Sequence, residues 1–306
     1  MSRLTLSVLV LTRNRAAPLL RCLDSIARQS LEAHEVIVLD DASDQLRVSD
    51  VLRDADVRHM RVLRSDVPLG IAGGRNQLLR EATGDVCFVI DDDAYIDEPN
   101  CLERLMQILE RRPNTAIVAA RIVDHRFPEP RLLVPFSKRQ RRRFPRLVNE
   151  AQKVSYFLGG GHAIRRDVFA KTGGYHEDFV FGEEELDLSY RIIQSGFDIF
   201  YAPDVVVHHA PMPSVLRSQA RPQSELFYHV RNRLFLAKQF LPAAYIAPYL
   251  AIWMSRHAFA AVRNGALSAF LRGVTSGLHA LGRHARTPLS GQALAYLRQN
   301  HGRLWF

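Results

Sequence analysis

Short apolar runs alternate with helix-like stretches and acidic turns over the first 120 residues. Several of the runs are bounded by Asp, Gly or Asn, which is typical of short buried strands. The segment 18–29 has leucines at helical spacing after Pro18, which suits the first turn of a helix. The expected strands are 6–11, 36–39, 61–63, 86–90 and 116–119. This alternation predicts an α/β domain with a mainly parallel sheet flanked by helices.

The pattern changes twice further along the chain. A Pro- and Arg-rich loop follows Val123, and the apolar pattern resumes at Tyr156, before three consecutive glycines. From Pro211 onward the pattern is mostly helical. The uncharged run 240–255 contains two prolines and is shorter than the roughly 18 apolar residues of a spanning helix, so it predicts an interfacial or buried helix. We therefore expect one domain over 1–210, in halves 1–120 and 121–210, and a helical region over 211–306.

Positive charge gathers in the C-terminal third. Residues 211–306 hold twelve Lys or Arg against the single acid Glu225, whereas residues 1–210 hold 29 bases and 31 acids; the whole chain carries a net charge of +9. A second basic run, 131–146, has seven Lys or Arg and no acid. Such patches attract polyanions: nucleic acid, anionic lipid or a phosphorylated substrate.

The start of the chain and its cysteines favour a cytoplasmic protein. Charged residues interrupt the first apolar run before a signal-peptide core forms, so we expect that run to be a buried strand. Three cysteines without metal-type spacing indicate neither a disulfide framework nor a zinc cluster, and fit a reducing compartment.

Three consecutive aspartates, Asp91, Asp92 and Asp93, follow the apolar run 86–90. Side chains two residues apart on an extended chain point the same way, so Asp91 and Asp93 converge where the strand ends. Converging carboxylates repel each other unless a cation lies between them. Mg²⁺ or Mn²⁺ suits such a site because it binds a few carboxylate oxygens and completes its shell with substrate phosphates. A solvated acidic turn explains the same run without any function, so the position at a strand end carries the metal hypothesis.

A second acidic cluster, Glu183-Glu184-Glu185-Leu186-Asp187, opens a helix with apolar residues at core spacing. Acids in a first helical turn are favoured by the helix dipole, which explains them without any function. A carboxylate here is also a candidate general base that takes the proton from an attacking hydroxyl. The local sequence leaves both explanations open.

Three weaker signals lie at other turns and strand ends. Asp41 follows an apolar run, where it can accept hydrogen bonds from a nucleotide or cap the next helix. The segment 70–76 would bring Arg75 near a diphosphate if it formed a phosphate-binding loop, although it lacks both the Walker and the dinucleotide glycine spacing. His208 also follows an apolar run, where a histidine is more often structural than a metal ligand.

Taken in order, these segments resemble the family 2 glycosyltransferases of the GT-A fold, from residue 4 to about residue 240. Each motif is common, but their joint order and spacing are hard to obtain by accident. The motifs are Val8-Leu9-Val10-Leu11-Thr12-Arg13-Asn14-Arg15, Val38 to Ser43, Gly70 to Asn76, Gly84-Asp85, Asp91-Asp92-Asp93, Phe157 to Gly161, Gly173-Gly174-Tyr175, Gly182 to Leu188, and Tyr201-Ala202-Pro203 leading to His208.

The resemblance implies the GT-A nucleotide-diphospho-sugar transferase fold with a helical, basic C-terminal extension. Residues 1–120 would be the nucleotide-binding half of the catalytic domain and 121–210 its acceptor half. Asp91 and Asp93, with His208, would bind Mg²⁺ or Mn²⁺ as a DxD metal site.

The resemblance also implies a catalytic base and substrate contacts. Glu185 takes the place of the family's catalytic Asp and is one methylene longer, which leaves Glu184 and Asp187 as rival bases. The Gln-x-x-Arg-Trp motif of processive members is absent, so transfer of a single sugar is expected. The implied donor-binding residues are Thr12, Arg13, Asn14, Asp41, Arg75, Asn76, Asp92 and Arg231, and the implied acceptor-binding residues are Gly160 and Gly161.

On this basis the chain is expected to be an inverting, rhamnosyltransferase-like or other surface-glycan transferase of the hexosyltransferase type (EC 2.4). Its donor would be a UDP- or dTDP-sugar, with GDP as the other option. Its acceptor would be a saccharide or lipid-linked saccharide of a cell-surface polysaccharide or glycolipid. The basic regions would hold it as a peripheral protein on the anionic inner face of a bacterial inner membrane.

Three other classes of protein would account for part of this pattern. A nucleic-acid-binding protein accounts for the positive charge but not for three acidic clusters that would repel phosphate, so no nucleic acid partner is expected. A nucleotidyltransferase usually has a Gly-rich loop after its first strand, where this chain has Thr12-Arg13-Asn14-Arg15. A catalytically inactive GT-A module for sugar binding or scaffolding stays open because Glu185 replaces Asp.

Overall fold

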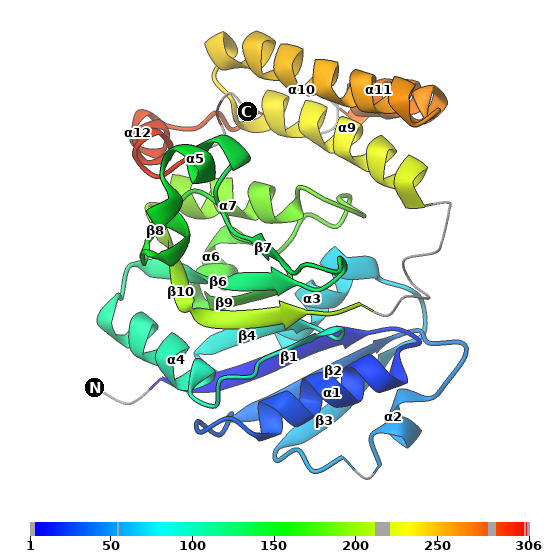
Figure 1. Cartoon of the computed structure of the whole chain (residues 1–306), viewed down its shortest axis with the longest axis vertical. Coiled ribbons are helices and arrows are strands. Elements are labelled where there is room, and N and C mark those ends of the chain that lie inside the picture. The colour runs from blue at the N-terminus through cyan, green and yellow to red at the C-terminus, as the bar shows by residue number, and fades with distance from the viewer. Residues whose placement is uncertain (1–3, 54, 212–220, 281–285, 303, 305–306) are drawn as a thin grey trace.

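A computed structural model describes residues 4–53, 55–211, 221–280, 286–302 and 304. One sheet runs through the molecule, with helices on both faces, and α9, α10 and α11 form a layer at one end (Figure 1). The strands are β1 (Leu6–Thr12), β2 (Glu35–Asp41), β3 (Met60–Ser65), β4 (Val86–Asp91), β5 (Ala94–Tyr95), β6 (Thr115–Asp124), β7 (Arg131–Leu133), β8 (Gln152–Val154), β9 (Gly161–Arg165) and β10 (Asp198–His209). The helices are α1 (Ala16–Ala27), α2 (Val48–Val51), α3 (Gly70–Glu81), α4 (Cys101–Arg111), α5 (Lys138–Arg143), the 3₁₀ helix η1 (Pro145–Asn149), α6 (Arg166–Thr172), α7 (Glu184–Gln194), α9 (Arg221–Phe240), α10 (Ala243–Arg263), α11 (Leu267–Ala280) and α12 (Gly291–Gln299).

The sheet is mixed, with its parallel part in the N-terminal half. The strand order is β3-β2-β1-β4-β9-β6-β10-β5, while β7 pairs with β6 and β8 with β10. The four strands from β3 to β4 are parallel, and β10 is parallel to β6. Strand β9 lies antiparallel to both of its neighbours, β4 and β6. All five expected strands are present, which confirms the predicted α/β sheet.

The strands are buried because helices cover both faces of the sheet. Alternate residues of β1 belong to two different cores: Leu9 faces one, and Val8 and Val10 face the other. Helices α1 and α4 pack on the face of Val8, whereas α3, α6 and α7 pack on the face of Leu9. This layering brings the ends of β1, β4 and β10 to one edge of the sheet.

Two segments with loop-like composition have regular structure. Residues 70–76 form the first turns of α3 rather than a phosphate-binding loop. Gly74 is helical, and a Cβ atom there would overlap the Leu11 side chain, so glycine lets α3 pack closely on β1. The Pro- and Arg-rich stretch contains β7, α5 and η1, and α5 begins with a Ser137–Gln140 capping box.

The C-terminal helices share the core of the sheet. Phe235, Leu236 and Phe240 of α9 belong to the same buried cluster as Leu186 and Ile192 of α7. The run 240–255 lies mostly within α10, which buries little of its length and contains Pro248. Among the described residues, no helix combines the length and the apolar composition needed to cross a membrane.

Candidate active site

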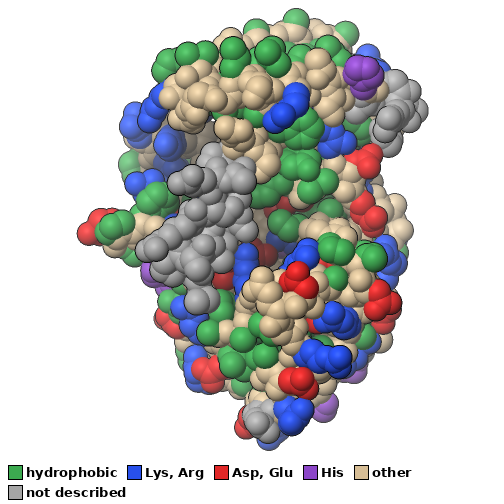
Figure 2. Space-filling model, turned by 90° about the vertical axis from the view of Figure 1, so that its right-hand side faces the viewer, with side chains coloured by type: hydrophobic (Ala, Val, Ile, Leu, Met, Phe, Trp, Pro, Cys, Tyr) green, Lys and Arg blue, Asp and Glu red, His purple; other side chains and the backbone are tan. Residues whose placement is uncertain are grey.

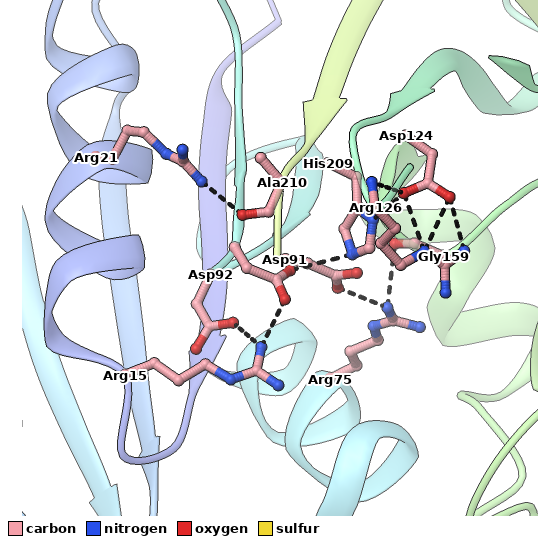
Figure 3. Close-up of polar contacts among 11 residues, drawn as sticks. Arg15, Arg21, Arg75, Asp91, Asp92, Asp124, Arg126, Gly159, His209 and Ala210 are labelled. Carbon is pink, nitrogen blue, oxygen red and sulfur yellow. Dashed lines mark hydrogen bonds and ion pairs between the residues drawn. The ribbon is translucent and has the colours of Figure 1, made fainter. Parts of the chain in front are cut away.

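A cavity of about 580 Å³ opens where the carboxyl ends of β1 and β4 meet the end of β10. Acidic side chains are recessed below the C-terminal helices in Figure 2, and Figure 3 shows their contacts. The cavity is lined by Leu11, Thr12, Arg13, Arg15, Asp41, Gly70, Ile71, Arg75, Asp91, Asp92, Asp93, Arg126, Val180, Phe181, His209, Pro211, Ser224, Glu225 and Tyr228. Ligands of open α/β sheets bind at such an edge.

Asp91, Asp93 and His209 form a group that could hold a metal ion. Each offers one ligand atom, and these atoms lie within 4.8 Å of one another. The His209 Nε2 is 3.3 Å from Asp93 Oδ1, and its Nδ1 is 3.2 Å from Oδ1 of Asp124, which is fully buried. A carboxylate behind an imidazole fixes the orientation of the ring and is a common support for a metal-binding histidine.

The histidine beside the aspartates is His209, whereas the resemblance implied His208. His208 does not join Asp91 and Asp93, because β10 continues through His209 and neighbouring residues of a strand point to opposite faces. The His208 ring stacks on Tyr95 at 5.0 Å, and its Nδ1 lies 3.0 Å from His125 Nε2. The apolar run 205–207 ends before both histidines, so the strand pattern does not indicate which of them faces the aspartates, and the resemblance implied His208.

Two arginines lie against the aspartates, as Figure 3 shows. Arg15 Nη1 is 2.8 Å from both Asp92 Oδ1 and Asp93 Oδ2. Arg75, which is 5% exposed, has Nη2 at 3.0 Å from Asp91 Oδ1. Burial raises the pKa of Asp92 to about 6, and the Arg15 charge opposes that rise. The guanidinium groups therefore reduce the repulsion among carboxylates that the sheet holds together.

Arg75 also connects the aspartates to α7. Its Nη1 lies 3.4 Å from Glu185 Oε1, so one side chain touches both the DxD segment and a candidate base. Gly159 makes this approach possible, because a Cβ atom there would overlap Glu185 and come within 2.7 Å of Arg75 Nη1. Burial raises the pKa of Glu185 above its ordinary value, and the Arg75 charge opposes that shift.

The other two candidate bases are placed differently. Glu184 is 4% exposed, and burial, followed by the Glu185 charge, raises its pKa to about 8. Asp187 is 1% exposed and its Oδ2 accepts a hydrogen bond from Arg191 Nε at 2.9 Å. Asp187 therefore forms a structural ion pair with Arg191. Glu185 is the candidate base that contacts Arg75, which lines the cavity.

Five of the predicted donor-binding residues line the cavity: Thr12, Arg13, Asp41, Arg75 and Asp92. The Thr12 hydroxyl donates to Asp92 Oδ2 at 2.7 Å. The two carboxylate oxygens of Asp41 accept from the amides of Leu69 (2.6 Å) and Gly70 (3.1 Å), so Asp41 also caps α3. Asp41 therefore lines the cavity and also contacts the start of α3, which is not the next helix along the chain, α2.

The other three predicted donor-binding residues have structural contacts away from the cavity. Asn14 accepts from the amides of residues 44 and 45 at 3.1 and 3.0 Å. Asn76 is buried and exchanges two hydrogen bonds with the backbone of Tyr175. Arg231 donates to the carbonyl of Asp178 at 2.6 Å. The structure thus does not bring these three to the aspartates.

Neither predicted acceptor glycine lines the cavity, whereas two arginines without a predicted role do. A Cβ atom at Gly160 would lie 3.2 Å from Asp91 Oδ2, whereas Gly161 lies in β9 against Val207. Arg15 belongs to the first motif of the resemblance and Arg126 to none of its motifs, and the resemblance implied no role for either. Arg126 Nε pairs with both oxygens of Asp124, at 3.0 and 2.9 Å. No sequence signal indicated Arg126, because its place depends on the pairing of β6 with β10.

Comparisons with known proteins find glycosyltransferases among the relatives of this chain. An "Uncharacterized glycosyltransferase" of Haemophilus influenzae is 34% identical over 110 residues, which are 36% of each chain. The amylovoran biosynthesis glycosyltransferase AmsE of Erwinia amylovora is 25% identical over 207 residues, 66% of this chain and 74% of that one. The chain spans between 36% and 55% of the length of the first curated relatives that it matches.

Solved structures show the same fold. The mannosyltransferase PcManGT of Pyrobaculum calidifontis, solved with GDP-Man and Mn²⁺, superposes with a TM-score of 0.60 and 23% identity, over 98% of this chain and 80% of that chain. A sequence model described as "Glycosyl transferase family 2" matches residues 7–173, just over half of the chain, from the second residue of β1 to just past the end of α6. The chain belongs to glycosyl transferase family 2.

Proposed function

We propose that the chain is an inverting glycosyltransferase that moves one sugar from a nucleoside-diphosphate donor to an acceptor hydroxyl, with the help of a divalent metal ion. The observation that carries the proposal is the placement of Asp91, Asp93 and His209 at one edge of the sheet, connected through Arg75 to Glu185. A nucleotide-sugar site needs a place for a cation, a place for the diphosphate and a base near the acceptor. The cavity lining offers residues for the cation and the diphosphate, and its Arg75 contacts Glu185, the candidate base.

The donor set fits Mg²⁺ or Mn²⁺. Two carboxylates and one imidazole within 4.8 Å leave coordination positions for phosphate oxygens. Such an ion, when bound, neutralises charge on the leaving diphosphate. GDP-Man and Mn²⁺ are bound by PcManGT, and UDP, GalNAc and Mn²⁺ by GalNAc-T7, which has the same fold at a TM-score of 0.59.

Side chains of the protein would bind the diphosphate and deprotonate the acceptor. Arg13 and Arg15 line the cavity beside the aspartates, where cationic groups can bind diphosphate oxygens. Glu185 takes the proton of the acceptor hydroxyl as that oxygen attacks the anomeric carbon from the face opposite the leaving group. Arg75 orients the Glu185 carboxylate. A single displacement inverts the configuration, so no covalent intermediate and no nucleophilic side chain are required.

The substrates are proposed by class. UDP or dTDP is favoured as the nucleotide, with GDP as the alternative. The acceptor is a saccharide or a lipid-linked saccharide in the synthesis of a cell-surface polysaccharide or glycolipid. AmsE and two O-antigen chain rhamnosyltransferases of Salmonella, RfbN and WbaN, are relatives with names of this kind. We place the enzyme in the cytoplasm, at the inner face of the bacterial inner membrane.

A thermal-shift experiment tests the proposal. The purified protein is heated with UDP, dTDP or GDP, each with Mn²⁺ or EDTA. Binding at a hundredfold excess over Kd stabilises a fold by about 2.7 kcal/mol. We expect stabilisation by one nucleotide with Mn²⁺ and its loss in EDTA, followed by sugar transfer from the matching donor.

Two histidine variants make the test specific. His209→Asn should lose the Mn²⁺-dependent part of the shift, because it removes one of the three ligand atoms. His208→Asn is the matched control and should keep the shift, because His208 contacts His125 and Tyr95 instead. Binding of a nucleotide without transfer to any acceptor would favour the inactive sugar-binding module. No shift with any nucleotide would overturn the proposal.

A further inference from the structure

The turn before α7 holds one residue, Glu183, in a backbone conformation that a side chain with a Cβ atom does not favour. Glu183 has φ of 73° and ψ of −3°, and Gly182 before it has φ of 74°. The left-handed region costs a residue with a Cβ atom about 1 kcal/mol or more. The turn directly precedes Glu184 and Glu185, so its conformation decides where the candidate bases point.

Helix α9 supplies contacts that hold this turn. Arg233 Nη2 lies 2.6 Å from Glu183 Oε2, and the two side chains are 4% and 8% exposed. The neighbouring Asn232 is fully buried and donates from Nδ2 to the carbonyls of Phe181 (3.1 Å) and Gly182 (2.8 Å). Two consecutive residues of α9 thus bind both the backbone of the turn and its acidic side chain.

Helix α10 fixes the other side of Arg233. Its Nη1 donates to the Tyr249 hydroxyl at 2.6 Å, and its guanidinium lies over the Trp253 ring, 3.8 Å from the ring centroid. A guanidinium stacked on an aromatic ring and paired with a carboxylate is held in one orientation. The turn, α9 and α10 are therefore connected through one buried side chain.

The turn also starts the helix that carries the base. The carbonyl of Glu183 accepts the hydrogen bond of the Asp187 amide at 2.9 Å, which is the first helical bond of α7. A change in the Glu183 backbone would rotate this first turn. The Glu185 carboxylate would then move relative to Arg75, from which it is separated by 3.4 Å.

We propose that Arg233 and Asn232 are positioning residues for the catalytic turn. They hold Glu183 in its left-handed conformation and so direct Glu185 towards the site. The C-terminal helices then belong to the catalytic apparatus, in addition to any role at a membrane. The inference rests on the proposed function where it takes Glu185 as the base.

Hydrogen exchange tests the structural half of the inference without any substrate. The double variant Glu183→Gln/Arg233→Met removes both charges, so no unpaired charge stays buried and the fold is spared that penalty. We expect faster amide exchange in peptides that span residues 183–190, and unchanged exchange in β1 and β4. Unchanged exchange at 183–190 would overturn the inference.

Steady-state kinetics test the catalytic half of the inference. The donor is the nucleotide sugar whose nucleotide gives the thermal shift, and the acceptors are lipid-diphosphate-linked monosaccharides. The double variant should lower kcat by between about tenfold and a hundredfold, since small misplacements of a catalytic group cost this much. The donor KM should stay near the wild-type value, and Arg233→Lys should recover part of kcat. If the two residues had only a structural role, the variant would be less stable but would show no selective fall of kcat at an unchanged donor KM.

An exposed ion pair serves as the control. Asp24→Asn/Arg28→Met on α1 removes a pair whose side chains are both 60% exposed, and it should change neither exchange at 183–190 nor kcat. Wild-type kcat in the Glu183/Arg233 variant would overturn the inference. If the wild-type protein transfers no sugar from any donor, the proposed function fails, while the exchange data still decide whether α9 holds the turn.

Discussion

Acidic side chains that face the cavity have cationic neighbours from distant parts of the chain. Arg15 follows β1, Arg75 lies on α3 and His209 ends β10, yet all three contact the segment 91–93. In a partly buried site such pairs cost desolvation but prevent repulsion among the carboxylates. Arg15 and Arg75 therefore offset part of the carboxylate charge and carry N–H donors that a phosphate group can use.

Replacement of Glu185 by glutamine separates donor binding from proton transfer. The amide keeps the size of the side chain and an oxygen that can accept from Arg75, but it does not take up a proton. We expect kcat to fall by about 10²- to 10⁴-fold. The thermal shift with nucleotide and Mn²⁺ should stay at the wild-type value. Steady-state transfer rates and the shift assay measure the two quantities.

Glu184, the buried neighbour of Glu185, is the competing candidate for the catalytic base. Glu184→Gln removes a carboxyl group whose pKa is raised to about 8 by burial and by the Glu185 charge. We expect its kcat to stay closer to the wild-type value than that of Glu185→Gln. The reverse order of the two variants would move the base to Glu184.

At the scale of elements, Glu35 ties together the strands of the nucleotide half. Its Oε1 accepts from the Ser7 hydroxyl of β1 (2.7 Å) and from the Thr83 amide before β4 (2.6 Å). Its Oε2 lies 3.3 Å from Arg61 Nε of β3. Burial alone would raise the pKa of Glu35, but these hydrogen bonds lower it to about 2 from an ordinary 4.5. The ionised form is therefore the one that stabilises the sheet.

The depressed pKa gives a stability prediction with a definite sign. The contribution is fully present above pH 4.5 and is lost as the pH falls from 4.5 towards 2. Glu35→Gln should lower the free energy of unfolding at neutral pH by about 2 kcal/mol, after allowance for solvent screening. The difference from wild type should shrink below pH 4.5 in denaturant titrations. The control is Glu81→Gln, which removes an exposed partner of Arg61 and should change the free energy of unfolding little. If Glu35→Gln lowered the free energy of unfolding equally at all pH values, the result would contradict the role of the ionised Glu35.

Elements with strong apolar periodicity could be predicted from the sequence, and their long-range partners could not. The five expected strands are present, because buried runs bounded by turn residues leave few alternatives. The segment 70–76 contains three glycines, which lower helix propensity, yet it lies within α3, where Gly74 packs closely on Leu11. The local sequence alone did not indicate this tertiary contact.

The same limit applies within the candidate site. Asp91 and Asp93 could be placed together because they belong to one local segment. His209 and Arg126 depend on how far β10 extends and on its pairing with β6, which no local pattern specifies. Asn14, Asn76 and Arg231 carry polar groups that turns and helices use for their own backbone, so motif position alone did not separate structural from cavity-facing residues.

At the scale of the whole molecule, exposed apolar side chains gather on the outer helices. Figure 2 shows hydrophobic side chains along the edge formed by α10 and α11. Phe259 and Val262 of α10 are each 70% exposed, and three leucines of α11 are about half exposed: Leu267, Leu271 and Leu278. The chain carries no acid after Glu225. Contiguous exposed apolar surface rimmed by basic residues is typical of a membrane contact.

We therefore expect this face to bind anionic lipid. The protein should float with vesicles of phosphatidylcholine and phosphatidylglycerol at low salt, less at high salt, and little with phosphatidylcholine alone, because the basic residues act through screened charge. Arg263→Gln/Arg272→Gln should lower binding by about 2 kcal/mol, roughly thirtyfold in the partition coefficient, since each arginine near an anionic surface contributes on the order of 1 kcal/mol.

Phe259→Ser/Val262→Ser should weaken binding at both salt concentrations, because it removes apolar area rather than charge. Val67→Ser, which changes a 62% exposed residue in the turn between β3 and α3, should leave flotation unchanged. Equal loss in Val67→Ser and Phe259→Ser/Val262→Ser would mean that binding is a general property of the surface, and absence of binding at low salt would exclude the membrane contact while leaving the transferase site untouched.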